Sequence, residues 1–217
     1  IYLKHNDGTY TVYAHLQRFN DELQSYIDSI RLEKLVFEID IQPEEDRFNF
    51  SRGEVIGFTG STGIGPPHLH FEIRDQYNEP VNALTSNLAI QDTIAPVISS
   101  LLVVPLSDST SIEGSKFPRL FYPTKEHTGA YTFSEISITG PVGFAISNFD
   151  EANNVPNKYA VFDAGIIQAQ DTIFFTKMDA FSFESAATMF LERISAMGAE
   201  RRSYQTFYSP DAARIPF

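Results

Sequence analysis

Apolar and polar residues alternate at the start of the chain with the period of two that is typical of β-strands. Residues 1–5 and 9–16 both show this pattern, and Asp7-Gly8 separates them. Because Asp-Gly between two such runs is a strong signal for a tight hairpin turn, we expect the chain to open on a β-hairpin. A fold that opens on one arm of a hairpin is expected to lack upstream elements. The sequence is therefore interpreted as a piece of a longer protein.

A helix and further strands are expected before residue 90. Apolar residues recur at helical spacing from Asn20 to Lys34, and Asn20 is placed to cap that helix. The remaining strands are expected at 36–41, 55–58 and 68–74, the second of them inside a glycine-rich stretch at 53–65. Residues 1–90 are accordingly predicted to form one β-rich domain.

Residues 91–217 are predicted to form a second domain. Pro96, at the end of Asp92-Thr93-Ile94-Ala95-Pro96, stiffens the chain before a new apolar run. Short β-type runs then recur between turn signals, which is typical of a small antiparallel sandwich; they lie at 97–104, 131–139, 142–147, 158–163 and 172–177. One helix is expected over 182–194, and the tail, 201–217, is expected to be irregular. The predicted fold class is therefore mainly β, with a β-sandwich-like second domain that contains one helix.

The composition restricts the classes of function. The chain has 217 residues, with 16 Lys and Arg against 28 Asp and Glu, and its formal net charge is −12. Binding to phosphates needs a basic footprint, so the sequence predicts no nucleic-acid partner. No apolar run approaches the roughly 20 residues of a membrane span, so no transmembrane segment is expected. Cysteine is absent, which excludes disulfides, thiolate nucleophiles and cysteine-type zinc sites.

The strand expected at 68–74 carries the candidate chemistry. Its sequence, His68-Leu69-His70-Phe71-Glu72-Ile73-Arg74, alternates without a break, so successive side chains point to opposite faces. The apolar residues are expected to face a core, and the polar ones, beginning with His68 and His70, to share the other face. Two imidazoles so placed allow one to bind a metal while the other touches its bound water. The alternative is that the segment is only the polar face of an amphipathic strand.

His15 is the second candidate, and it lies in the predicted strand segment Tyr13-Ala14-His15-Leu16. Considered alone, it is more typical of a hydrogen-bonded structural histidine than of a catalyst. His5 is assigned to the hairpin turn, and His127 to a loop without a partner. No Ser, His and Asp arrangement resembles a hydrolase triad.

In order along the chain, these residues resemble the M23 family of zinc peptidases, the lysostaphin- and LytM-like peptidoglycan endopeptidases. The resemblance covers about residues 1 to 84 and rests on His5-x-Asp7-Gly8, Tyr13-Ala14-His15-Leu16, Gly53-Glu54-Val55-Ile56-Gly57, Gly60-x-x-Gly63 and His68-Leu69-His70-Phe71-Glu72. The continuation through Pro80-Val81-Asn82 and Asp92 to Pro96 is similar to a branch found in Bacteroidota that carries an extra C-terminal β-domain. The resemblance implies a partial M23-type β-barrel or sandwich for residues 1–90 and an accessory domain for 91–217.

The resemblance also implies roles for individual residues. The family holds a catalytic Zn²⁺ with the His and Asp of a His-x-x-x-Asp motif and with the second His of His-x-His, which is His70 here. The first His of that pair, His68, corresponds to a catalytic histidine, and His15 corresponds to its partner. Zinc in such sites polarises the scissile amide and lowers the pKa of its bound water, while histidines move protons.

The sequence departs from the family in its metal ligands. No His-x-x-x-Asp occurs: the residue four positions after His5, His15 and His127 is Thr, Phe and Tyr, respectively. Two explanations stay open, an upstream position for the missing ligands and a degenerate family member that is kept for binding. A second departure is Pro66-Pro67 before His68, where the family has one Pro or none; it is expected to alter the loop that leads into the site.

Two functions follow from these expectations. The first is a zinc-dependent endopeptidase of the cell envelope, periplasmic or associated with the outer membrane, that cuts peptide cross-links of peptidoglycan. The second is a non-catalytic scaffold or regulator whose partners are envelope or outer-membrane proteins. Under both, His15, His68 and His70 are expected to converge on one groove, and this chain alone is not expected to hold zinc tightly at His70.

Overall fold

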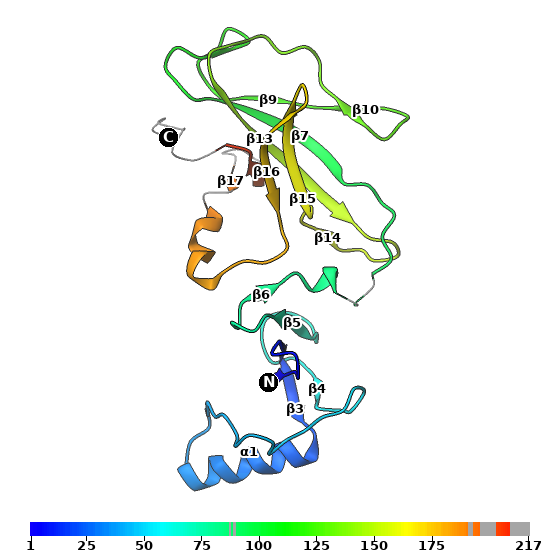
Figure 1. Ribbon diagram of the computed structural model, residues 1–217, viewed down its shortest axis with the longest axis vertical. Helices are drawn as coiled ribbons and strands as arrows, with labels where there is room; N and C mark the ends of the chain where they lie inside the picture. The colour runs from blue at the N-terminus through cyan, green and yellow to red at the C-terminus, as the bar shows by residue number, and fades with distance from the viewer. Residues whose placement is uncertain (87, 89, 191–192, 196–202, 209–217) are drawn as a thin grey trace. The chain divides into compact units, whose positions relative to one another are not determined.

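The computed structural model describes residues 1–86, 88, 90–190, 193–195 and 203–208. It divides into two compact units, Ile1–Pro80 and Val81–Phe217 (Figure 1). Antiparallel strands dominate both units, so the expected mainly-β fold class is confirmed. No described helix is long and apolar enough to cross a membrane.

The first unit is built on a four-stranded sheet in the order β1-β2-β5-β6. Its strands are β1 (Tyr2–Lys4), β2 (Tyr10–Ala14), β5 (His70–Arg74) and β6 (Pro80–Val81). The expected hairpin joins β1 and β2, which are antiparallel with Tyr2 opposite Val12. Gly8 supplies the positive φ of the turn (87°), and the Asp7 carboxylate accepts from the Thr9 amide at 3.0 Å. A smaller sheet pairs β3 (Leu16–Phe19) with β4 (Gly57–Thr59).

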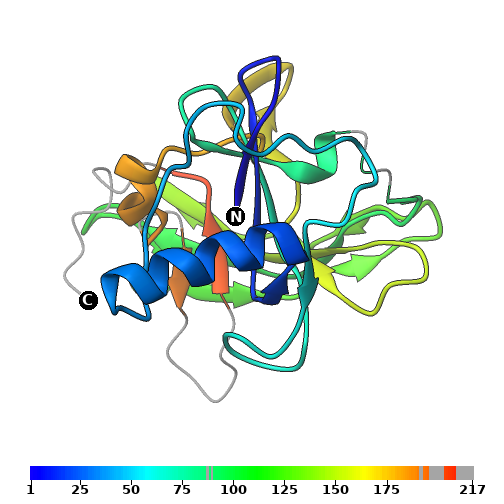
Figure 2. The same cartoon turned by 90° about the horizontal axis from the view of Figure 1, so that it is seen from below.

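The expected helix is confirmed as α1 (Asp21–Lys34), seen lengthwise in Figure 2. Asn20 caps its N-terminus, because the side-chain oxygen accepts a hydrogen bond from the Leu23 amide at 3.0 Å. Leu23 is the buried residue of the apolar stripe, and Tyr26 packs edge-on against Phe48 with ring centroids 5.1 Å apart.

Two strand predictions in the first unit need correction. The segment 36–41 forms no strand: α1 ends at Lys34, its C-cap Leu35 is in the left-handed conformation (φ 53°), and Phe37 is 82% exposed. Apolar residues favour a strand there, but strand pairing needs a partner, and the described segment has none. The short strand expected at 55–58 lies at Gly57–Thr59, where it pairs with β3.

The second unit has its main sheet in the order β17-β18-β13-β7-β9, with β14 paired to β13. The central pair is β7 (Val97–Pro105) with β13 (Val142–Glu151), whose register is broken by a bulge at Ser147/Asn148. The flanking strands are β9 (Arg119–Phe121), β14 (Lys158–Tyr159), β17 (Arg193–Ser195) and β18 (Ser203–Thr206). Separate pairs are formed by β8 (Ser111–Ile112) with β12 (Ile138–Thr139), β10 (Thr124–Lys125) with β11 (Tyr131–Thr132), and β15 (Asp163–Gln168) with β16 (Asp171–Lys177).

Sequence patterns place the long strands of this unit correctly and the short ones less well. The strands expected at 97–104, 142–147 and 172–177 correspond to β7, β13 and β16. The run 131–139 is two short strands, β11 and β12, with no strand between them, and 158–163 holds β14 and only the start of β15. Both runs lack a continuous partner strand along their length.

The C-terminal part of the chain differs most from expectation. The helix expected over 182–194 is a 3₁₀ helix, Phe183–Phe190, and Ile194 belongs to β17; Leu191 lies outside the described residues. The expectation of an irregular tail is wrong at β18, which pairs with β13 and buries Tyr204 to 1% exposure. The Tyr204 hydroxyl forms a hydrogen bond of 3.1 Å with the Ser100 hydroxyl, so this buried polar group has a partner inside the sheet. A short Asn82-capped 3₁₀ turn, η1 (Ala83–Thr85), opens the unit.

Candidate functional site

Three histidines from two segments of the chain lie close together in the first unit. The ring centroids of His15 and His68 are 4.8 Å apart, and those of His15 and His70 are 5.8 Å apart. His70 opens β5, His68 stands two residues earlier in an isolated bridge with Gly60, and His15 lies between β2 and β3. The three rings lie close together as expected, although His15 and His68 are 53 positions apart in the chain. The expected groove is lined by His15 and His70 but not by His68.

His15 reaches this position through an unusual backbone. The expectation of a continuous strand over 13–16 is wrong: β2 ends at Ala14, β3 begins at Leu16, and His15 has φ 59°. A left-handed residue with a side chain is uncommon, and here it interrupts the strand between Ala14 and Leu16. The break places the imidazole beside His68 and His70.

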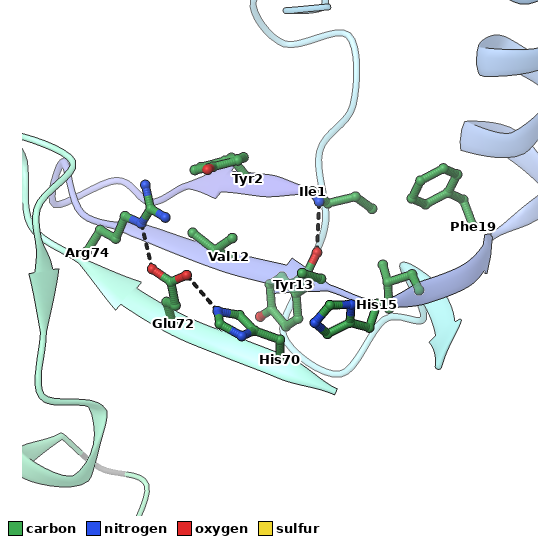
Figure 3. Close-up of a pocket in the computed structure, with 11 residues that line it drawn as sticks. Ile1, Tyr2, Val12, Tyr13, His15, Phe19, His70, Glu72 and Arg74 are labelled. Atoms are coloured by element: carbon green, nitrogen blue, oxygen red, sulfur yellow. Dashed lines mark hydrogen bonds and ion pairs between the residues drawn. The ribbon is translucent and has the colours of Figure 1, made fainter. Parts of the chain in front are cut away.

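Histidines 15 and 70 line a hollow of about 460 Å³ over one face of the sheet (Figure 3). Its floor includes Tyr2, Val12 and Glu72, which lie in one row across β1, β2 and β5. The same hollow is lined by Phe19 and Arg74 at its ends, among others. The hollow thus combines apolar side chains with imidazole, carboxylate and guanidinium groups, as ligand sites commonly do.

His70, Glu72 and Arg74 form a hydrogen-bonded row along β5 (Figure 3). Glu72 Oε1 accepts from His70 Nε2 at 2.7 Å, and its Oε2 accepts from Arg74 Nε at 2.8 Å. The side chains are progressively more buried, at 47% exposed for His70, 23% for Glu72 and 9% for Arg74. The hydrogen bond from Arg74, and then that from His70, outweigh partial burial and lower the pKa of the Glu72 carboxyl. The same carboxylate raises the pKa of Arg74, whose guanidinium also lies 5.0 Å from the ring centre of Tyr2.

Hydrogen-bond partners determine which ring nitrogen each histidine offers. His68 Nδ1 lies 2.8 Å from the Pro66 carbonyl oxygen, which can only accept, so Nδ1 carries the hydrogen and Nε2 keeps the lone pair when the ring is neutral. His70 has the reverse arrangement, because Nε2 donates to the Glu72 carboxylate and Nδ1 keeps the lone pair. The pair therefore offers two basic nitrogens of opposite type, suited to accepting a proton or binding a metal.

The face assignments on β5 are largely those expected. His70, Glu72 and Arg74 share one face, and Phe71 packs on the other against Tyr13, with ring centroids 5.3 Å apart. Leu69 departs from its expected place in a core, because it is 44% exposed. The reason is that β5 begins only at His70, so Leu69 lies in the loop that leads into the strand.

The described residues do not form a metal centre by themselves. No group of three or more His, Asp or Glu side chains within the described ranges is arranged to hold a metal ion. A catalytic zinc site needs three protein ligands and an open position, and the described ranges hold no such set of side chains. Zinc therefore does not fit a site built from these residues alone.

Two features of the site do not follow from the sequence. One is the Pro66 carbonyl that orients His68: the double proline indicates an altered loop, but not that this loop supplies the acceptor. The other is Gly63, whose backbone lies against the His15 ring. The Gly60-x-x-Gly63 spacing is the available signal for the second feature, but spacing does not reveal which side chain a glycine contacts.

Comparison with known proteins gives no match for this chain, either to a family model, to a curated protein or to a solved structure.

Proposed function

We propose that the chain is part of a zinc-dependent endopeptidase of the bacterial cell envelope that hydrolyses peptide cross-links of peptidoglycan. The observation that supports this proposal best is the meeting of His15, His68 and His70, with ring centroids 4.8 and 5.8 Å from His15. These are the three positions whose motifs resemble the histidine motifs of M23 peptidases. The hollow beside them gives a peptide substrate room to lie along the sheet.

In this proposal the histidines have different tasks. His68 offers Nε2 as a base, because the Pro66 carbonyl occupies its other nitrogen. His15 lies against His68 and steadies the charge that appears when His68 accepts a proton. His70 is a metal ligand held in one orientation by Glu72. The proposal requires a His-x-x-x-Asp motif outside the 217 residues of this chain, since the described residues do not complete a zinc site.

The substrate and location follow from the same proposal. The substrate is a peptide of peptidoglycan, and the protein acts in the periplasm or at the outer membrane. Neutral or acidic peptides face a chain of net charge −12, so recognition depends on the groove and not on general electrostatic attraction.

The test is hydrolysis of purified cross-linked muropeptides by the full-length protein, with and without a chelator. We expect cleavage that the chelator abolishes and that added Zn²⁺ restores. His68→Ala should lower kcat by about 10²–10⁴-fold, the usual contribution of a general acid-base group. His127→Ala is the matched control, because His127 is an exposed histidine of the second unit, and it should leave kcat unchanged. A folded, zinc-loaded full-length protein without activity would overturn the proposal.

The second candidate is a non-catalytic scaffold or regulator that holds an envelope or outer-membrane protein. The absence of a three-ligand cluster among the described residues favours it. The upstream gene sequence separates the two: a His-x-x-x-Asp motif there supports the peptidase, and a complete upstream domain without that motif supports the scaffold.

A further inference from the structure

The residues at 60–65, termed here the glycine loop, lie along the segment that contains His15. Three contacts join them: the Gly60 amide donates to the His15 carbonyl at 3.3 Å, the Thr62 hydroxyl donates to the Leu16 carbonyl at 3.1 Å, and Gly63 lies against the His15 ring. The glycine loop therefore contacts both the backbone and the side chain of His15.

The contact at Gly63 leaves no room for a side chain. A Cβ at this position would lie 2.3 Å from His15 Nδ1 and 2.6 Å from His15 Cε1, far inside van der Waals contact. The atoms in the way belong to the His15 ring and not to the flexible end of a long side chain, so an added Cβ would displace the whole ring. A Cβ added at Gly60 would likewise lie 2.3 Å from Gln17 Cβ, so the loop follows the chain closely from His15 to Gln17.

His15 itself needs an external restraint. Its φ of 59° is a conformation that costs a residue with a Cβ free energy, and such conformations persist only where surrounding contacts hold them. The glycine loop supplies such contacts, one to the His15 carbonyl and one to the His15 ring. Without those contacts the imidazole has other rotamers available, since the ring is only half-buried.

We propose that Gly63 is a positioning residue, which lets the glycine loop lie directly on the His15 imidazole and hold it against His68. This inference rests on the proposed function for its catalytic consequence, because His15 matters there as the partner of His68. The structural part of the inference, the position of the His15 ring, can be tested without measuring activity.

The chain offers a matched control for the test. Gly65 has a positive φ of 96°, and a Cβ added there would meet no atom within 4 Å, whereas Gly63 has φ 118° and the His15 ring in contact. Alanine at either position strains the backbone, but only alanine at Gly63 collides with His15. A difference between the two variants therefore reports the ring contact and not the strain.

The first measurement uses the 217-residue chain labelled with ¹³C and ¹⁵N, and records nuclear Overhauser effects between the imidazole protons of His15 and His68. We expect these cross-peaks in the parent and in Gly65→Ala, and their loss in Gly63→Ala. Retention of the cross-peaks in a folded Gly63→Ala variant would overturn the proposal. If Gly63→Ala does not fold, His15→Ala combined with Gly63→Ala should fold, because the ring is gone; failure of that double variant beside a folded Gly65→Ala would also overturn it.

The second measurement uses the full-length enzyme and compares kcat with KM. Gly63→Ala should lower kcat by about a hundredfold, the effect of a small misplacement of a reacting group, with KM changed at most a few-fold. In a His15→Ala background the same substitution should add no further loss, because the two changes act on one contact. An inactive parent enzyme would overturn the proposed function only, since the cross-peaks still decide the position of the ring.

Discussion

At the residue scale, the chemistry of the site depends on the hydrogen-bond acceptors beside His68 and His70. A backbone carbonyl fixes His68, and a carboxylate fixes His70. The carboxylate is in turn held by Arg74, which is only 9% exposed at its side chain. Two imidazoles that are two residues apart in sequence thus carry their hydrogen on different nitrogens, His68 on Nδ1 and His70 on Nε2.

The first prediction concerns those hydrogen positions. At alkaline pH, where imidazoles are neutral, His68 should carry its hydrogen on Nδ1 and His70 on Nε2. Long-range ¹H–¹⁵N correlation spectra of the imidazole rings distinguish the two tautomers. His127, an exposed histidine of the other unit, serves as the reference for an unconstrained ring. An Nε2–H form at His68 would contradict the assignment.

The second prediction is a pH dependence of stability from Glu72. Its pKa is lower in the folded chain than in the unfolded one, so its ion pair stabilises the fold fully above its unfolded pKa of about 4.3 and is lost as the pH falls through the lower folded value. Glu72→Gln should cost about 1–3 kcal/mol of unfolding free energy at pH 7. The difference from the parent should shrink as the pH falls below about 4. Urea unfolding at several pH values measures this, with Glu45→Gln, in an exposed loop, as the control. A difference that does not change with pH would contradict the ion-pair explanation.

At the element scale, the N-terminus of α1 connects the helix to β4. Asn20 accepts from the Leu23 amide through its oxygen and donates to the Val55 carbonyl at 3.0 Å through its nitrogen. Its backbone amide also donates to the Ile56 carbonyl at 3.0 Å. The Asn20 side chain thus caps the helix and also holds the segment that leads through β4 into the glycine loop.

The third prediction separates these two tasks. Asn20→Ala should destabilise the fold by about 1 kcal/mol for the lost cap, and by about 0.5–1.5 kcal/mol for the lost hydrogen bond to Val55. Asn20→Ser keeps a cap acceptor but has no amide to reach Val55, so its loss should be the smaller one. Chemical unfolding followed by far-ultraviolet circular dichroism gives both values. Equal losses for the two variants would show that the cap contributes nothing.

At the scale of the whole molecule, the chain carries a separate set of buried residues in each unit. Val12 and Leu23 are buried in the first unit, and the second has Val103, Ile112 and Tyr204 at 0–1% exposure. The histidine cluster and its hydrogen-bond partners all belong to the first unit.

The fourth prediction follows from that division. Ile112→Ala removes a fully buried side chain of the second unit and should destabilise that unit by about 2–5 kcal/mol. The His15–His68 cross-peaks of the first unit should persist in this variant under native conditions. Thermal unfolding followed by resolved amide signals of both units checks the result, with Ile138→Ala, at 36% exposure, as the milder companion. Loss of the His15–His68 contact in Ile112→Ala would contradict the assignment of the site to the first unit alone.

The sequence by itself determined features that depend on local periodicity and turn chemistry. These include the hairpin around Asp7-Gly8, the helix capped by Asn20, the shared face of His70, Glu72 and Arg74, and the long strands of the second unit. Each is set by residues close together in the chain, or by the strict alternation of a strand, so no distant partner is needed to recognise it.

Only the tertiary structure decided features that depend on distant partners. The apolar run 36–41 stays out of any strand because it has no described partner, whereas the polar segment 203–206 becomes a buried strand because β13 pairs with it. The alternation of residues 13–16 does not reveal the left-handed backbone of His15. The contact of Gly63 with the His15 ring joins positions 48 apart, so the spacing of the glycines does not reveal which side chain they meet. Pairing and close packing therefore overruled local preference wherever backbone hydrogen bonds or steric fit came from elsewhere in the chain.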